Sequence, residues 1–427
     1  MEKREKQELY SAYKDILREE LIPAMGCTEP IAIALAAAKS RDVLGCIPER
    51  VLVEASGSII KNVKSVIVPH TNQMRGIDVA AAVGIVGGQA EKMLEVIADV
   101  SEEQKGALDE YIEKTEIITK YAQNGHVFDI IVTVYANGHS ASVRIADYHT
   151  NIVHIEKDGE VILDNPLGED SSDRETDRSI LSVERIWDFV NEADYEDLKQ
   201  ILEPQYIYNM AISKEGLTND YGAKIGKTLL KTYGDDIKVR ARAAAAAGSD
   251  ARMNGCEMPV IINSGSGNQG ITASVPVITY AKELGVSEEK MYRALALSNL
   301  IAIHQKTRIG ALSAYCGAMS AGVGAGCAIA FLLGADLETV KATLINAVVT
   351  VSGIICDGAK ASCAAKIAVA VEAGINGYYQ HIDGNDFRGG DGIVGTDVES
   401  TIKNVGRLAA QGMDITNDVI IKTMIGE

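Results

Sequence analysis

The spacing of apolar and polar residues predicts a mixture of helices and strands over the first part of the chain. Residues 5–22 carry apolar side chains at three-to-four spacing, which predicts an amphipathic helix. Residues 118–163 alternate apolar and polar positions around Asn-Gly and Asp-Gly pairs, which predicts an antiparallel meander. The same reasoning predicts further strands over 50–59 and 64–71 and further helices that start near 28, near 78 and at 102.

The pattern changes near residue 182, after which strand signals disappear and helices with Gly or Asn stops follow one another. We therefore predict an α+β N-terminal domain with antiparallel strands over residues 1–185 and an all-α C-terminal domain over 186–427. This prediction is compatible with packing of the first helices on the C-terminal domain. The acidic, aperiodic stretch 165–179 is predicted to be a linker or surface loop.

Composition and charge exclude some classes of function. The chain has 427 residues and a formal net charge of −18, which argues against nucleic acid or an anionic membrane as a partner. No uninterrupted apolar run of about 18 residues occurs, so no transmembrane helix is predicted. The charged N-terminal helix does not resemble a signal peptide, and a cytoplasmic location is predicted. In that reducing compartment, the seven cysteines are expected to bind metal, to react or to be buried rather than to form disulfides.

Cys27 stands where a helix begins. Thr28 or Cys27 occupies the cap position, Glu29 falls in the first turn, and Pro30 suits an early helical position. The positive end of the helix dipole is expected to lower the pKa of the Cys27 thiol and make it reactive. The alternative is a buried cysteine that happens to precede a cap.

Two polar segments are candidate ligand sites. His70, Asn72, Arg75 and Asp78 cluster in a turn between two apolar elements, with Asp78 as the expected helix cap, although a solvated loop explains them equally well. A Gly-rich loop leading into a helix could bind a carboxylate through backbone amides and polar side chains, although it could also be a simple connection between helices. The polar residues of this loop are Ser264, Ser266, Asn268 and Gln269.

Four further cysteines lie among Gly, Ala and Ser residues between 310 and 366. By spacing alone, Cys316, Cys356 and Cys363 could be buried helix cysteines, ligands of an iron–sulfur cluster or ligands of zinc. Zinc is disfavoured because no histidine accompanies them at finger-like spacing. Cys327 is predicted to be a core residue, and Cys46 and Cys256 are predicted to be structural.

The cluster interpretation leads to a reaction class. Three thiolates on a four-iron cluster leave one iron open, and an open iron can act as a Lewis acid on a leaving group. With a loop for a carboxylate and a thiolate at Cys27 to take a proton, these parts suit β-elimination from a small amino acid.

Several sequence blocks follow one another along nearly the whole chain. They read GCTEPIA, GSIIKNVKSVIVPHTNQMRGIDVAAAVGIVGG, DYHTNIVHI, SGSGNQGI, CGAMSAGVGAGCA and CDGAKASC. Together they resemble the L-cysteine desulfidase family, which is related to the iron–sulfur-dependent L-serine dehydratases (L-serine ammonia-lyases). The resemblance implies a serine-dehydratase-like fold and a [4Fe–4S] cluster in the helical domain, with Cys316, Cys356 and Cys363 as ligands. It also implies that Cys27 is the catalytic thiol.

Departures from the dehydratase pattern favour the desulfidase. Gly26, Cys27 and Thr28 replace a Ser-His-Thr segment, Met74–Asp78 replaces Gly-His-Gly-Thr-Asp, and the chain ends Ile-Gly-Glu where dehydratases often carry a cysteine. The prediction is a pyridoxal-phosphate-independent lyase that converts L-cysteine to sulfide, ammonia and pyruvate. The alternatives are an L-serine dehydratase with the same cluster and a non-catalytic small-molecule-binding protein.

The predicted catalytic residues are Cys27, His70 and Arg75. The predicted substrate-binding residues are Thr28, Asn72, Ser264, Ser266, Asn268 and Gln269. The expected partners are a small amino-acid substrate and a second copy of the chain, in a homodimer.

Overall fold

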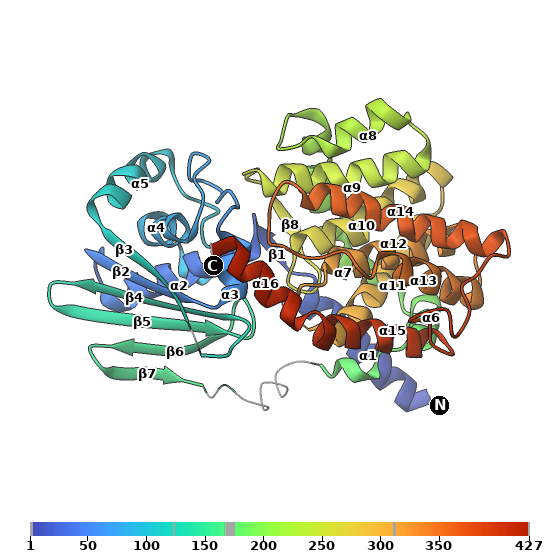
Figure 1. Ribbon diagram of the computed structural model, residues 1–427, viewed down its shortest axis with the longest axis horizontal. Helices are drawn as coiled ribbons and strands as arrows, with labels where there is room; N and C mark the ends of the chain where they lie inside the picture. The colour runs from blue at the N-terminus through green and yellow to red at the C-terminus, as the bar shows by residue number, and fades with distance from the viewer. Residues whose placement is uncertain (1–2, 123, 166, 168–175, 311–312, 426–427) are drawn as a thin grey trace.

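The computed structural model describes residues 3–122, 124–165, 167, 176–310 and 313–425. A β-sheet with its helices forms one side of the molecule and a large group of helices forms the other (Figure 1). The predicted α+β architecture, with the sheet in the N-terminal part and a mostly helical C-terminal part, is confirmed. The predicted loop over 165–179 lies largely outside the described residues, which leave out 166 and 168–175.

The larger sheet has six strands in the order β3-β2-β4-β5-β6-β7. Strands β4 to β7 are successive antiparallel neighbours, so the predicted meander is confirmed for them. Strand β3 does not join the meander, because it pairs in parallel with β2. Helices between β2 and β3 supply the long crossover that a parallel pair needs. The strands span Arg50–Ala55 (β2), Glu116–Tyr121 (β3), Asp129–Ala136 (β4), His139–Ala146 (β5), Ile152–Lys157 (β6) and Glu160–Asp164 (β7).

Four helices accompany the sheet: α2 (Thr28–Leu44), α3 (Gly57–Val63), α4 (Ile77–Gly87) and α5 (Glu102–Lys114). Helix α2 packs on β4, β5 and α4, and almost all of its residues are buried because Ala and Ile fill both of its faces. The backbones of α2 and α4 touch at Gly84, where an added Cβ would come within 2.3 Å of the Ala34 carbonyl oxygen. Helix α2 is therefore fixed in the centre of this region.

The helical region is built around α12 (Gly317–Leu332), in which every residue from Ala318 to Leu332 is buried. Its glycines allow close packing, because a Cβ on Gly322 or Gly326 would collide with the backbone of α14. The surrounding helices are α6 (Val183–Glu192), α7 (Tyr195–Thr218), α8 (Ile225–Tyr233), α9 (Ile237–Met253), α10 (Gly267–Leu284), α11 (Glu288–Ile309), α13 (Leu337–Val351), α14 (Cys363–Ile382) and α15 (Val398–Arg407).

Both ends of the chain connect the two regions. Helix α1 (Lys3–Glu20) packs on the helical side, where Lys6 pairs with Glu192 and Lys14 with Asp197. Helix α16 (Asp414–Ile425) returns to α3 beside the sheet (Figure 1). Strand β1 (Pro23–Met25) pairs antiparallel with β8 (Pro259–Ile261) between the two regions.

Four local predictions are wrong. The strand predicted over 50–59 ends at Ala55, because Ser56 caps helix α3 and residues 57–59 are helical. Strand β8 lies in the region that was expected to be wholly helical, because β1 offers it a partner across the junction. Residues 64–71 form no strand beyond one bridge between Ile67 and Arg75, since Pro69 lacks a backbone donor and the chain then turns back. Gly76, not Asp78, is the N-cap of α4, and Asp78 lies inside its first turn.

In the part of the chain that the structure describes, no helix combines the length and apolar character needed to cross a membrane. Cys327 and Cys256 are buried, as predicted, whereas Cys46 is exposed and the prediction of a structural role for it is wrong.

A buried carboxylate in the helical region yields a prediction about stability. Asp250 on α9 accepts a hydrogen bond from the backbone N–H of Gly226 at the start of α8, and burial raises its pKa to about 6. Because the unfolded pKa is lower, ionisation of Asp250 should cost stability as pH rises from about 4 to 6. We expect Asp250→Asn to raise the free energy of unfolding by about 2 kcal/mol at pH 8, and by much less at pH 4.

Urea denaturation at a series of pH values measures this difference. Asp236→Asn is the matched control, because Asp236 is an exposed helix cap whose pKa is lowered by its hydrogen bonds to Lys238. Its substitution should change stability in the opposite direction. A pH-independent difference between Asp250→Asn and the wild type would contradict this account.

Candidate active site

A cavity of about 110 Å³ lies where the sheet region meets the helical region, and four cysteines line it. They are Cys27, Cys316, Cys356 and Cys363. Four of the predicted substrate-binding residues line the same cavity, namely Ser264, Ser266, Asn268 and Gln269. Thr28 stands behind the wall, where its hydroxyl donates to the carbonyl of Gly265 at 2.9 Å. The structure thus brings together residues that are far apart in the sequence.

Three of the cysteines lie at the ends of helices that meet at the cavity. Cys316 is the N-cap of α12, Cys363 is the first residue of α14, and Cys356 lies in the loop between α13 and α14. Backbone hydrogen bonds tie the Cys316 and Cys356 segments together, because the N–H of Cys316 donates to the carbonyl of Ile354 and the N–H of Cys356 donates to the carbonyl of Ala314. The small residues around them leave room for the thiols to face the cavity.

The thiols of Cys316, Cys356 and Cys363 line the same cavity and are close enough to act on one another electrostatically. Among the described residues, no group of three or more His, Cys, Asp or Glu side chains is close enough to hold one metal ion. The thiols that bind a four-iron cluster contact separate iron atoms and stand farther apart. Burial, followed by the charges of Cys356 and Cys363, raises the pKa of Cys316 to about 12. The Cys316 thiol is therefore neutral in the protein alone, and bound metal would be needed to make it a thiolate.

The loop before α10 forms the opposite wall. Ser264 has a φ of 48°, a left-handed conformation that is uncommon for a residue other than glycine. The side-chain oxygens of Asn268 and Gln269 are buried and have no hydrogen-bond partner among the described residues. Gln269 also lies against the first residue of α12, where a Cβ on Gly317 would come within 2.6 Å of its Cδ. This loop therefore offers unsatisfied polar groups close to Cys316.

A buried carboxylate that the sequence reasoning did not single out connects the walls of the cavity. Glu29 accepts hydrogen bonds from the Asn62 side-chain amide at 2.9 Å and from the Cys27 thiol at 3.1 Å. His149 Nε2 lies 3.9 Å from Glu29 Oε1, which is too long for a hydrogen bond but close enough for attraction between charges. Burial alone would raise the pKa of Glu29, but its neighbours His149 and Cys27 outweigh burial and hold it at about 2.

The predicted low pKa of the Cys27 thiol is wrong. Cys27 is the N-cap of α2, as expected, but burial and the negative charge of Glu29 raise its pKa well above the ordinary value. The attraction of the helix N-terminus is weaker than these two effects. Cys27 is therefore a neutral thiol that donates to Glu29.

His149 faces the cavity from the loop between β5 and β6. Its ring packs edge-to-face on Phe128, with 4.8 Å between the ring centroids, and it lies against Gly265. Its Nε2 is buried and has no hydrogen-bond partner among the described residues. The sequence showed this histidine only as part of a strand pattern, and nothing in that pattern marks it as part of the site.

Two buried lysines also line the cavity and were missed. Lys61 on α3 donates to Asn417 of α16 at 2.7 Å and to the backbone carbonyl of Cys356 at 3.4 Å. Lys306 lies in the last turn of α11, and burial lowers its pKa to about 8 although Cys356 and Cys316 act against this shift. In the sequence, both lysines resemble ordinary surface positions of a helix.

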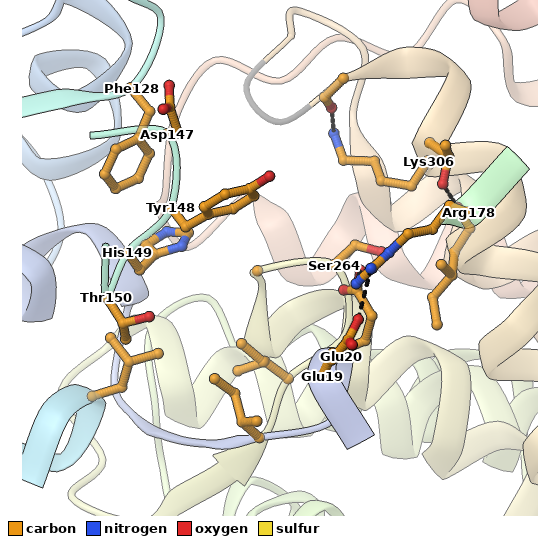
Figure 2. Close-up of a pocket in the computed structure, with 17 residues that line it drawn as sticks. Glu19, Glu20, Phe128, Asp147, Tyr148, His149, Thr150, Arg178, Ser264 and Lys306 are labelled. Atoms are coloured by element: carbon orange, nitrogen blue, oxygen red, sulfur yellow. Dashed lines mark hydrogen bonds and ion pairs between the residues drawn. The ribbon is translucent and has the colours of Figure 1, made fainter. Parts of the chain in front are cut away.

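A second cavity of about 270 Å³ adjoins the first, since both are lined by His149, Ser264, Gly265 and Lys306. Tyr148 and His149 lie on one side of it, and Arg178, Lys306 and Ser264 on the other (Figure 2). Arg178 forms ion pairs with Glu19 and Glu20 at its rim. This larger cavity is the adjoining space through which a small molecule could reach the cysteines.

Besides Thr28, three predicted site residues do not line either cavity. Asn72 and Arg75 are exposed in the loop before α4. His70 lies in the same loop, 3.3 Å from Glu257, and burial lowers its pKa. The structure does not bring His70, Asn72 or Arg75 to the cysteines, and their assigned roles stay predictions.

Comparison with known proteins gives a consistent result. The model of the family described as serine dehydratase alpha chain matches residues 91–422, well over half of the chain. A UPF0597 protein of Desulfitobacterium hafniense is 53% identical over 418 residues, which cover 98% of this chain and 97% of that protein. UPF0597 proteins of Lachnoclostridium phytofermentans and Treponema denticola are 52% and 48% identical, and the matches cover 98% and 97% of this chain and 100% and 98% of those proteins. The predicted relationship to the serine dehydratases is confirmed.

The low pKa of Glu29 leads to a prediction. Because its folded pKa of about 2 is below the unfolded value, ionised Glu29 should stabilise the fold above about pH 4.5, and this contribution should be lost as pH falls from there towards 2. We expect Glu29→Gln to lower the free energy of unfolding by about 3 kcal/mol at pH 7 and to lower the pKa of Cys27.

Denaturant unfolding against pH tests the first effect, and the pH dependence of Cys27 alkylation, followed by mass spectrometry, tests the second. Glu113→Gln, at an exposed position of α5, is the control and should change neither. Equal stability of Glu29→Gln and the wild type at pH 7 would show that Glu29 is not the stabilising anion described here.

Proposed function

This chain belongs to the serine dehydratase alpha chain family, and we propose that it is a lyase that catalyses β-elimination from a small amino acid. The specific proposal is an L-cysteine desulfidase, which forms sulfide, ammonia and pyruvate. The observation that carries it is one cavity lined both by four cysteines and by a polar loop at a helix N-terminus. Such a cavity offers a metal-binding side and an anion-binding side within reach of one small substrate.

The residues that would hold a [4Fe–4S] cluster are Cys316, Cys356 and Cys363. Three thiol ligands on one wall and a donor set without close single-ion geometry are consistent with this group. When bound, the cluster would supply a Lewis acid for the leaving group through an iron that has no protein ligand.

The protein's own residues would orient the substrate and move its proton. The loop from Ser264 to Gln269 would bind the α-carboxylate at the N-terminus of α10. His149 in its neutral form is the better proton acceptor, because no described residue forms a hydrogen bond with its Nε2, whereas Cys27 already holds its proton. Glu29 would stabilise the imidazolium that forms after the proton moves to His149.

The bond changes balance with these groups. The α-proton passes to His149 Nε2, and the electron pair of the Cα–H bond becomes the Cα=Cβ bond of aminoacrylate. The Cβ–S bond breaks, and its electron pair leaves with sulfur as sulfide. Aminoacrylate then takes up a proton at Cβ to form an imine, which water hydrolyses to pyruvate and ammonia. The imidazolium of His149 would return that proton to Cβ, which restores the neutral imidazole, while the Cys27 thiol would keep its own proton on Glu29.

A second candidate function is L-serine dehydratase with the same cluster, which the family match favours. The two activities differ only in whether oxygen or sulfur leaves Cβ. The absence from this sequence of the dehydratase Ser-His-Thr segment, replaced by Gly26, Cys27 and Thr28, supports the desulfidase. A non-catalytic binding protein is the remaining alternative, and it gives no reason for three cysteines to share one cavity wall.

The first test is a substrate comparison with protein reconstituted anaerobically with iron and sulfide. We expect equal amounts of sulfide and pyruvate from L-cysteine, with a kcat/KM at least about tenfold above that for L-serine, the scale on which fitted pockets separate substrates that differ by one small group. Greater activity on serine would favour the dehydratase. The absence of product from any β-substituted amino acid would overturn the lyase proposal.

The second test concerns the cysteines. Cys316→Ser, Cys356→Ser and Cys363→Ser should each reduce bound iron and reduce activity at least about 100-fold, since loss of one ligand weakens or removes a metal centre. Cys46→Ser is the control, because Cys46 is exposed and outside both cavities. Iron per chain, measured by elemental analysis, and visible absorbance are the readouts. Full iron content in all three variants would contradict the assignment.

A further inference from the structure

A buried arginine without a partner lies beside the polar loop. Arg252 is in the last turn of α9, and only 2% of its surface is exposed. Its Nε and Nη2 atoms are shielded from solvent and have no hydrogen-bond partner among the described residues. The side chain lines the cavity that contains the cysteines. None of the sequence motifs considered above contains this residue.

The isolation of this guanidinium requires an explanation. Burying a charged group without a partner costs several kcal/mol, and native proteins pair nearly all such groups. Asp250 is two residues away on the same helix, but it faces α8 and accepts from Gly226 N–H. Glu29 is engaged by Asn62 and Cys27. Among the described residues, no carboxylate forms a hydrogen bond or ion pair with Arg252, so an anion bound in the cavity would compensate its charge.

The position of Arg252 indicates what kind of anion fits. The guanidinium lies directly against Gly267, the first residue of α10, because a Cβ there would come within 2.3 Å of Nε. Helix α10 has 18 residues, and its N-cap Ser266 makes no capping hydrogen bond with its side chain. A fixed cation and the positive end of a helix thus converge on one point of the wall. The planar fork of arginine matches the two oxygens of a carboxylate.

We propose that Arg252 binds the α-carboxylate of the substrate and thereby restricts the site to free amino acids. This inference rests on the proposed function, and it adds a recognition residue and a substrate class to it. The carboxylate is held at the α10 side of the cavity, and the β-substituent then faces the wall that carries Cys316, Cys356 and Cys363. An amino-acid ester, or a cysteine whose carboxylate is in a peptide bond, lacks the anion that Arg252 requires.

A competing explanation is that Arg252 only balances the charge of the cysteines. Its positive charge acts on the thiols of Cys27 and Cys363. In that case, loss of the guanidinium would alter iron binding but would leave recognition of the carboxylate unchanged. The two explanations therefore differ in a measurable way.

The test uses three variants of the reconstituted full-length protein. Arg252→Met removes the charge, Arg252→Lys keeps the charge but loses the fork, and Gly267→Ala keeps the arginine but displaces it. Arg240→Met is the matched control, because Arg240 is on the same helix, is partly exposed and pairs with Glu283 away from both cavities. Circular dichroism and iron content show whether each variant folds and is loaded.

The first readout is calorimetric binding of L-alanine, which has the carboxylate but no leaving group. We expect Arg252→Met to weaken binding at least about 100-fold, the scale for loss of a charged, bidentate pair. Arg252→Lys and Gly267→Ala should weaken it by about tenfold, and Arg240→Met should not change it. The second readout is sulfide release, for which kcat/KM for L-cysteine should fall mainly through KM in Arg252→Met. Turnover of L-cysteine methyl ester, already slow in the wild type, should change little.

The outcomes separate this inference from the proposed function. Loss of L-alanine affinity in Arg252→Met, in a protein that releases no sulfide from any amino acid, would sustain the carboxylate site and overturn the desulfidase. If the wild type releases sulfide, but Arg252→Met and Arg252→Lys keep its affinity for L-alanine and its discrimination against the ester, the inference is overturned and the proposed function stands. Reduced iron content with unchanged L-alanine affinity in Arg252→Met would show that Arg252 only balances charge. Failure of the wild type to bind L-alanine would also overturn the inference.

Discussion

The site depends on one buried carboxylate, Glu29, and on the groups that make its burial tolerable. An isolated carboxylate in the interior would take up a proton, but the pKa of Glu29 is about 2 because its neighbours favour the anion. Those neighbours come from separate parts of the fold, with Asn62 on α3, His149 between β5 and β6, and Cys27 at the start of α2. The anion is stable only when these elements are assembled, so folding and completion of the site are coupled.

Close backbone contacts supply the second constraint. Two side chains that line the cavity pack directly against glycines of neighbouring helices. Arg252 packs against Gly267, and Gln269 packs against Gly317. Gly358 allows the same close packing against α3, since a Cβ there would come within 2.2 Å of the Lys61 carbonyl oxygen. A larger residue at any of these positions would separate two walls of the cavity. The abundance of Gly and Ala between 310 and 366 thus reflects the requirement to bring a helical core and a cysteine-lined cavity into the same space.

Local patterns were sufficient for the helices, for the antiparallel part of the sheet and for the residue types of the cysteine wall and the polar loop. They failed where a distant partner decides the outcome. Strand β8 exists because β1 pairs with it, and the Cys27 thiol is neutral because burial and Glu29 prevail over the helix N-terminus. Arg252 resembles an ordinary basic residue in a last helical turn, since the sequence does not reveal that its surroundings exclude water. Cysteines and glycines can be identified as candidates from residue type alone, whereas a buried charge without a partner can be identified only from the three-dimensional structure.

The charges around the cavity also link its contents to its protonation. Arg252, Lys61 and Lys306 line it with Glu29 as the only carboxylate, among the described residues, that does so. Burial lowers the pKa of Lys306 to about 8, while the nearby cysteines act to raise it. Thiolates or a carboxylate entering this space add negative charge, so they must raise the pKa of Lys306 and stabilise its ammonium form. By thermodynamic linkage, a proton on Lys306 then strengthens the binding of those same anions. The cavity therefore takes up anions and protons together, which suits a site that must hold a carboxylate and release an anionic leaving group.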